Sequence, residues 1–275
     1  MKFENISVYN FDNALRGMRN PKNSWDKSDS QFGIAHLDQV DTIADDVADA
    51  WIRKEYPDLM PENYEALLEE KHEWLIKNGI IQVDDDYCTF AFIGPNDMGL
   101  AQALIKGGSE HRKFMRQIFV SVDITAPLYW WKEFDTYKVG TVANSTSTMH
   151  KMASKPITLD CFEIDDYDNS IFTNPEEIDY FIQFLESLRL KYLATQDKRY
   201  WKELIRWLPE SWLQTRTVTM DYENFLAMCS RGQRRFHKLN EWSGQDNATL
   251  PNFIAMSRDL PYAQHLIFLD ELAQA

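Results

Sequence analysis

The stretch RQIFVSVDITAP, residues 116–127, and the segment YWWKEFDTYKVGTVANSTSTMHKM, residues 129–152, decide the predicted fold. The first is dense in β-branched residues and ends at a proline, which is typical of a buried strand. The second starts with aromatic residues and continues with small hydroxyl and amide side chains beside Lys138, His150 and Lys151. We therefore expect a strand, a helix and a polar loop in succession.

Upstream of this stretch, the pattern predicts two helices and a strand. Residues 61–79 carry apolar side chains at helical spacing, with acids in the first turns and Gly79 placed for a left-handed cap. Residues 87–93 (YCTFAFI) indicate a buried strand that ends at Gly-Pro. Residues 96–108 indicate a short helix with a glycine stop.

Downstream, the chain is mostly helical. Asn174 followed by Pro-Glu-Glu predicts a helix start, and residues 197–209 and 221–242 predict two further helices. No repeat or low-complexity linker divides the chain. We expect one α+β domain over residues 1–275, helix-rich in its C-terminal half, with an acidic helical insertion at about residues 38–86.

Composition narrows the function classes. The 275 residues carry a formal net charge of −14, which disfavours general nucleic-acid binding but allows a local basic pocket for a small anion. Cys88, Cys161 and Cys229 are far apart and lack metal-ligand spacing, so no metal site is expected. No signal peptide or membrane-spanning run is apparent. These features predict a soluble, cytoplasmic protein, and they suit a bacterial or phage origin.

Three basic places stand out, each with two interpretations. The hydroxyl-rich loop at 141–151 is either a phosphate site or a loop that caps the next element. The run RGQRRFHK at 231–238 is either an anion site or a basic helix end. For KGGSEHRKFMRQ at 106–117 a solvated face is favoured. The acidic runs at 84–86 and 165–166 are interpreted as solvated turns.

Taken in order, these segments resemble the flavin-dependent thymidylate synthases, the thymidylate synthase-complementing family. The family signature is R-H-R-x-x-S-x-N-E-x-S-x-R-Y. Aligned without gaps, Thr136-Tyr137-Lys138 fall on R-H-R, and Thr141 and Thr146 fall on the two serines. A shift of one residue instead places Asn144 and Ser147 on the asparagine and second serine. Both registers stay open.

The later half also resembles the family. Arg206, Leu208 and Pro209 resemble its R-x-x-L-P motif. Thr219 opens the counterpart of T-x-N-x-R, in which Asp221 and Glu223 replace the asparagine and arginine. The family's substrate-orienting arginine falls on Gly232, with arginines on either side, and Arg116-Gln117 stand in place of the family's Glu-His. The resemblance spans roughly residues 98–242 and is weakest at the signature.

The resemblance implies an α+β fold with an antiparallel or mixed sheet and long helices, assembled as a homotetramer. It also implies FAD and dUMP at subunit interfaces, with NADPH and methylenetetrahydrofolate as co-substrates for one-carbon transfer to C5 of the pyrimidine. The residues carried over comprise two predicted as catalytic, Arg234 and Arg231; five as substrate-binding, Asn144, Ser145, Ser147, Lys151 and Arg235; and five as cofactor-binding, Arg116, Gln117, Tyr137, Lys138 and His237.

Three function hypotheses follow. The first is a divergent flavin-dependent thymidylate synthase-like enzyme. The second is a non-catalytic nucleotide-binding protein that kept the scaffold and lost flavin chemistry. The third is an interaction protein that uses the acidic helix near residues 62–73. The aromatic residues Trp130, Trp131, Phe134 and Tyr137 either stack on a ligand ring or belong to the core.

Overall fold

The computed structural model describes residues 1–230 and 234–272. The chain forms two compact units. Unit 1 comprises Met1–Ile6, Ser121–Thr219 and Phe236–Ala255; unit 2 comprises Ser7–Val120, Met220–Arg235 and Met256–Ala275. Because three strands run from one unit into the other, each unit is built from segments far apart in the sequence.

Unit 1 contains most of a four-stranded sheet with strand order β1-β5-β7-β6. Its strands are β1 (Lys2–Tyr9), β5 (Phe119–Pro127), β6 (Val142–Ser145) and β7 (Leu213–Asp221). Strand β6 pairs antiparallel with β7, from Val142 opposite Thr219 to Ser145 opposite Arg216. The strand predicted between residues 116 and 127 is confirmed as β5, in which alternate side chains are buried, as the pleat requires.

The core of unit 1 is aromatic. Helix α5 (Leu128–Phe134) follows Pro127 and buries Trp130, Trp131 and Phe134 completely or nearly so. The Trp130 ring centroid lies 5.6 Å from that of Trp242 and 5.3 Å from that of Phe134. These three side chains of α5 therefore belong to the core, and the ligand-stacking interpretation is wrong for them because no face of their rings is open.

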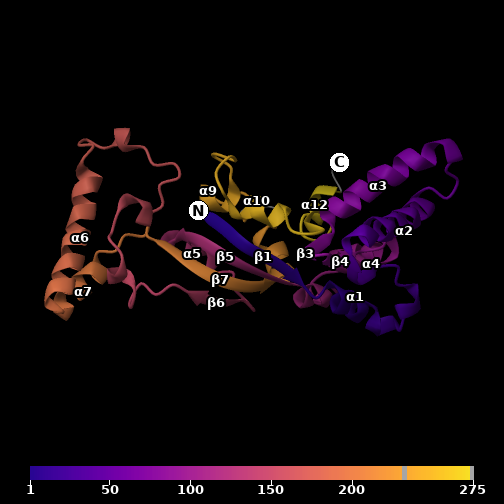
Figure 1. Cartoon of the computed structure of the whole chain (residues 1–275), viewed down its shortest axis with the longest axis horizontal. Helices are drawn as coiled ribbons and strands as arrows, with labels where there is room; N and C mark the ends of the chain where they lie inside the picture. The colour runs from indigo at the N-terminus through magenta and orange to yellow at the C-terminus, as the bar shows by residue number, and fades with distance from the viewer. Residues whose placement is uncertain (231–233, 273–275) are drawn as a thin grey trace. The chain divides into compact units, whose positions relative to one another are not determined.

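A helix pair lies at the far end of the β6–β7 connection. Helices α6 (Glu177–Thr195) and α7 (Lys198–Arg206) lie side by side (Figure 1) and bury Leu185, Leu188 and Leu204 in one cluster. Both predicted helices are confirmed. The Asp197 side chain caps α7 by accepting a hydrogen bond from the Arg199 amide. Three 3-10 turns precede the pair: η5 (Met152–Ser154), η6 (Leu159–Cys161) and η7 (Asn169–Ile171).

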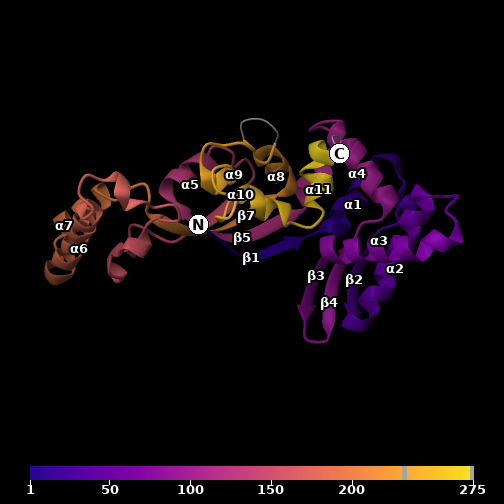
Figure 2. The same ribbon diagram turned by 90° about the horizontal axis from the view of Figure 1, so that it is seen from above.

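Unit 2 has its own antiparallel sheet, with strand order β2-β4-β3. Its strands are β2 (Gln31–His36), β3 (Ile80–Asp84) and β4 (Tyr87–Phe92), which confirms the strand predicted at 87–93. Asp85, at φ 50°, turns the β3–β4 hairpin. Helices α2 (Leu37–Glu55) and α3 (Tyr64–Asn78) lie beside this sheet (Figure 2), and the turn η3 (Pro61–Asn63) leads into α3.

Gly79 ends α3 for a reason other than the predicted one. Its backbone is extended, with φ −76° and ψ 165°, so the left-handed cap is wrong. A β-carbon at this position would lie 2.7 Å from the Phe92 ring and 2.8 Å from the Leu75 carbonyl oxygen. Glycine is needed here because α3 and β4 approach each other closely.

The remaining elements are short. The predicted helix at 96–108 is confirmed as α4. Where one helix is predicted over 221–242, the described residues form two shorter ones, α8 and α9. The elements are α1 (Phe11–Arg19), η1 (Asn20–Lys22), η2 (Trp25–Lys27), α4 (Pro95–Lys106), η4 (Lys113–Gln117), α8 (Tyr222–Met228), α9 (Asn240–Ser243), α10 (Phe253–Arg258), α11 (Ala263–Leu266) and α12 (Leu269–Leu272). The architecture is α+β with antiparallel pairing in both sheets, as predicted.

Candidate functional site

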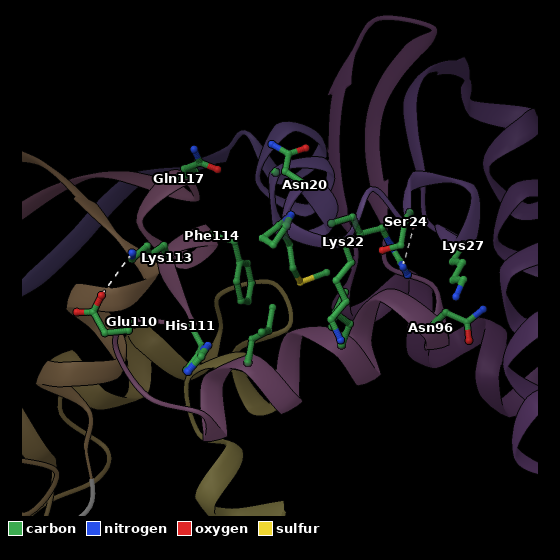
Figure 3. A pocket seen from close by; sticks show the side chains of 16 residues that line it. Asn20, Lys22, Ser24, Lys27, Asn96, Glu110, His111, Lys113, Phe114 and Gln117 are labelled. Carbon is green, nitrogen blue, oxygen red and sulfur yellow. Dashed lines mark hydrogen bonds and ion pairs between the residues drawn. The ribbon is translucent and has the colours of Figure 1, made fainter.

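A cavity of about 1060 Å³ lies in unit 2, between the end of α1, the turns that follow it, α4 and the segment that leads to η4 (Figure 3). Its floor is one face of α4, where Asn96, Leu100 and Leu104 recur every fourth residue and so point the same way. The volume lies just above the roughly 300–1,000 Å³ range of small-molecule sites. The cavity is large enough for a nucleotide.

The wall opposite α4 is basic. Lys22 and Lys27 come from the turns after α1, and His111 and Lys113 follow α4. Within residues 1–230 and 234–272, neither Lys22 nor Lys27 has a carboxylate within ion-pair distance, and Lys113 is paired with Glu110 at 3.4 Å. Two uncompensated ammonium groups at one cavity, in a chain of net charge −14, attract an anion.

A buried ion pair anchors the lysine-bearing turns to α4. Asp97 is fully buried and accepts hydrogen bonds from Arg19 Nε at 2.5 Å, Ser28 Oγ at 2.6 Å and Ser30 Oγ at 2.5 Å. Since Lys22 and Lys27 lie between Arg19 and Ser28, the carboxylate of Asp97 holds both ends of the segment that carries them.

Asp29 fastens the same segment to the start of α4. Its carboxylate accepts hydrogen bonds from the backbone N–H groups of Asn96 and Asp97, at 2.7 and 3.1 Å. A β-carbon at Gly94 would lie 2.3 Å from the Asp29 carbonyl oxygen, so only glycine allows this approach. The positive N-terminal end of the α4 dipole is thereby already met by the carboxylate of Asp29.

Gln117, predicted to bind a cofactor, lines this cavity. Its carbonyl accepts a hydrogen bond from Asn10 Nδ2 at 2.8 Å, and its side-chain oxygen faces Gly17, where a β-carbon would lie 3.0 Å away. Arg116 Nη2 lies 3.7 Å from Glu223, a carboxylate that Arg112 also contacts through Nε at 3.0 Å. The structure places the two consecutive residues in different surroundings.

The arginines predicted near the substrate are held in different ways. Arg231 lies outside the described residues. Arg234 donates to the Ala227 carbonyl at 2.8 Å. Arg235 is buried and donates to Asp270 at 2.7 Å, to Glu271 at 2.8 Å and to the Cys229 carbonyl at 2.8 Å. Its guanidinium joins α12 to the segment that follows α8.

The Glu271 carboxylate predicts an acid-sensitive contribution to stability. Hydrogen bonds from Arg258, together with the charges of Arg258 and Arg235, lower the pKa of Glu271 below its ordinary value of 4.5. A depressed folded-state pKa stabilises the fold fully above the ordinary value, and this stability is lost as the pH falls through the depressed pKa. Urea unfolding should therefore show Glu271→Gln less stable than wild type at about pH 7 and equal to it at about pH 2. An unchanged difference at both pH values would contradict this assignment.

The predicted residues of unit 1 fall into two sets. Asn144 and Ser145 lie on β6 with exposed side chains, and Lys151 is exposed as well. The Ser147 hydroxyl oxygen accepts a hydrogen bond from the His150 amide at 2.9 Å, so it caps the turn of the loop. Exposure and local capping are the properties of a surface turn that presents polar groups.

The second set converges on acidic side chains. Tyr137 Oη donates to Glu133 Oε1 at 2.7 Å, and His237 Nε2 lies 3.3 Å from the same oxygen. Lys138 Nζ lies 3.3 Å from Asp135. The structure thus brings together Tyr137 and His237, residues that are 100 positions apart in the sequence. It also places both Lys138 and His237 beside a carboxylate.

The sequence interpretation missed Lys22, Lys27 and His111. A signal was present, since Arg16, Arg19, Lys22 and Lys27 form a basic run in a chain that is otherwise acidic. It was not recognised because no motif accompanies it. The segment 106–117, for which the sequence favours a solvated face, contributes five residues to the cavity wall: Glu110, His111, Lys113, Phe114 and Gln117.

Residues 1–230 and 234–272 contain neither a membrane-spanning helix nor a metal-binding cluster. No helix there has the length and apolar character needed to span a bilayer. No group of three or more histidine, cysteine, aspartate or glutamate side chains there is arranged to hold a metal ion.

No protein-family model matches the chain, and no curated protein matches its sequence. The solved structures that are similar to this chain include two of flavin-dependent thymidylate synthase from Helicobacter pylori complexed with FAD and dUMP. The first is 15% identical, with 86% of this chain and 96% of that chain covered, at a TM-score of 0.45. The second is 14% identical, with 88% and 98% covered, at a TM-score of 0.44. These low values leave the ligand of this chain to be argued from its own residues.

Proposed function

We propose that the protein binds a pyrimidine deoxynucleotide, dUMP or a close relative, in the cavity beside α4. The observation that carries this proposal is the pair of uncompensated ammonium groups of Lys22 and Lys27 at a cavity of about 1060 Å³. Two lysines on adjoining turns can bind a phosphate, to which lysine acts as a point charge. The pyrimidine is proposed from the resemblance of the ordered segments to the thymidylate synthase-complementing family.

The first candidate function is that of a divergent thymidylate synthase-like enzyme, which would transfer a one-carbon group to C5 of the base. FAD, when bound, would supply the redox chemistry, with NADPH and methylenetetrahydrofolate as co-substrates. The cavity side chains fit the phosphates of such a cofactor as well as those of a nucleotide, because lysine, histidine and amide groups all donate hydrogen bonds. Gln117 is the predicted cofactor residue that lines the cavity.

One observation favours the second candidate, a nucleotide-binding protein without flavin chemistry. Lys138, placed on the family's R-H-R motif, is within 3.3 Å of Asp135, and His237 is within 3.3 Å of Glu133. A cation beside a carboxylate offers a phosphate less net positive charge than a free one does. Lys138, paired in this way, would bind a cofactor phosphate less strongly than an unpaired lysine.

An absorbance spectrum combined with calorimetry separates the two candidates. The purified protein is incubated with FAD, desalted and scanned for the visible flavin bands, and dUMP is titrated in parallel. Retained flavin together with dUMP binding supports the enzyme. Binding of dUMP without retained flavin supports the non-catalytic protein. Absence of dUMP binding would overturn both.

A further inference from the structure

The cavity beside α4 has two chemically different ends. Its floor runs from Asn96 to Leu104, eight helical steps apart, which is about 12 Å at 1.5 Å per step. Figure 3 shows Lys22 and Lys27 toward one end and Glu110 toward the other. A ligand that fills the cavity therefore meets one set of groups at each end.

Among the described residues, the end near Asn96 is lined by two lysines and by no carboxylate side chain. Lys22 and Lys27 have no ion-pair partner in the described part of the chain, and the Asn96 side chain adds an uncharged donor. The backbone N–H groups of Asn96 and Asp97 are taken by Asp29, so α4 itself offers no free donor there. The groups at this end that attract an anion are therefore the lysine side chains and not the start of α4.

The end beyond α4 is polar but balanced. Lys113 is neutralised by Glu110 at 3.4 Å, and Gln117 and His111 complete the lining. Gln117 offers both a donor and an acceptor, and Glu110 offers an acceptor. Such a set suits the imide edge of a pyrimidine, which presents carbonyl acceptors and an N–H donor, better than it suits a phosphate.

The middle of the cavity is apolar. Leu100 and Leu104 form the floor, and Met18 and Phe114 contribute to the walls. Apolar side chains pack against the faces of a sugar or a base without competing for its polar groups. From the Asn96 end to the Glu110 end, the lining is thus first cationic, then apolar, and then polar with its charges paired.

We infer that the cavity binds a nucleoside monophosphate in one orientation, with the phosphate between Lys22 and Lys27 and the base edge at Gln117 and His111. This inference rests on the proposed function and adds the direction of the ligand. It makes Lys22 and Lys27 the residues that select for the phosphate, and Gln117 and His111 those that read the base.

A ligand-by-variant cycle tests the orientation. Affinities for dUMP and for deoxyuridine are measured with wild type, Lys22→Gln, Lys27→Gln and Gln117→Leu. Each lysine variant should weaken dUMP about tenfold and leave deoxyuridine unchanged. Gln117→Leu should weaken both ligands by the same factor. Lys106→Gln is the matched control, because Lys106 lies on α4 without lining this cavity.

If deoxyuridine binds too weakly to measure, the salt dependence of dUMP affinity tests the orientation instead. In each lysine variant the affinity for dUMP should fall less steeply with salt concentration, because a positive charge at the phosphate has been removed. Gln117→Leu should leave this salt dependence unchanged. Equal loss of both ligands in the lysine variants, or a flattened dependence in Gln117→Leu alone, would overturn the orientation while the proposed function stands. Absence of dUMP binding to wild type would overturn both.

Discussion

Replacing Asp97 by alanine is expected to lower the free energy of unfolding by about 3–5 kcal/mol. The carboxylate is fully buried and accepts from Arg19, Ser28 and Ser30. Its removal leaves the buried Arg19 guanidinium without a counter-charge and both hydroxyls without an acceptor. Urea unfolding followed by circular dichroism measures the change.

The control for this prediction is an exposed ion pair. Lys132 and Glu210 pair on the surface of unit 1 with both side chains largely in solvent. Lys132→Ala should cost at most about 1 kcal/mol, because solvent screens the pair. If Asp97→Ala costs no more than Lys132→Ala, the Asp97 network does not hold the lysine-bearing turns to α4. In that case the cavity would lack the rigid wall that the proposed function needs.

Replacing Trp131 by alanine should cost about 3–5 kcal/mol, the usual loss for a large aromatic side chain removed from a core. Trp131 is completely buried, donates from Nε1 to the Gln214 carbonyl at 2.9 Å, and lies under the Arg216 guanidinium at 4.2 Å from its ring centroid. Alanine removes the packing, the hydrogen bond and the cation–π contact together. Denaturant unfolding again gives the measurement.

The neighbouring tryptophan provides a matched comparison. Trp130 is equally buried on the same helix, but within the described residues its Nε1 has no hydrogen-bond partner. Trp131→Phe should therefore be more destabilising than Trp130→Phe by about 1–3 kcal/mol, because only the former leaves a buried carbonyl without its donor. Equal losses would show that the Trp131 indole contributes through its volume alone.

Several local elements were predictable because their signals lie within a few residues of each other. The β-branched run that ends at Pro127 defined β5, and Asp197, with its capping side chain, began α7. The buried face of α5 was already one of two interpretations of its aromatic side chains. Fold class follows from such local patterns, since hydrogen-bonded helices and strands have fixed periods that a short window of sequence reveals.

The pairing of charges was decided only by the tertiary structure. Arg235 was predicted at a substrate because its segment is basic, yet it meets Asp270 and Glu271, some 35 residues later. Asp97 reaches back to Arg19 across 78 positions and thereby positions the segment with Lys22 and Lys27. A sequence shows which residues carry charge, but which of them are neutralised depends on partners that only folding brings within hydrogen-bond distance. The lysines of the cavity that folding leaves without a carboxylate partner among the described residues, Lys22 and Lys27, form the candidate site. The sequence alone therefore determined the helices and strands of this protein, but not its basic cavity.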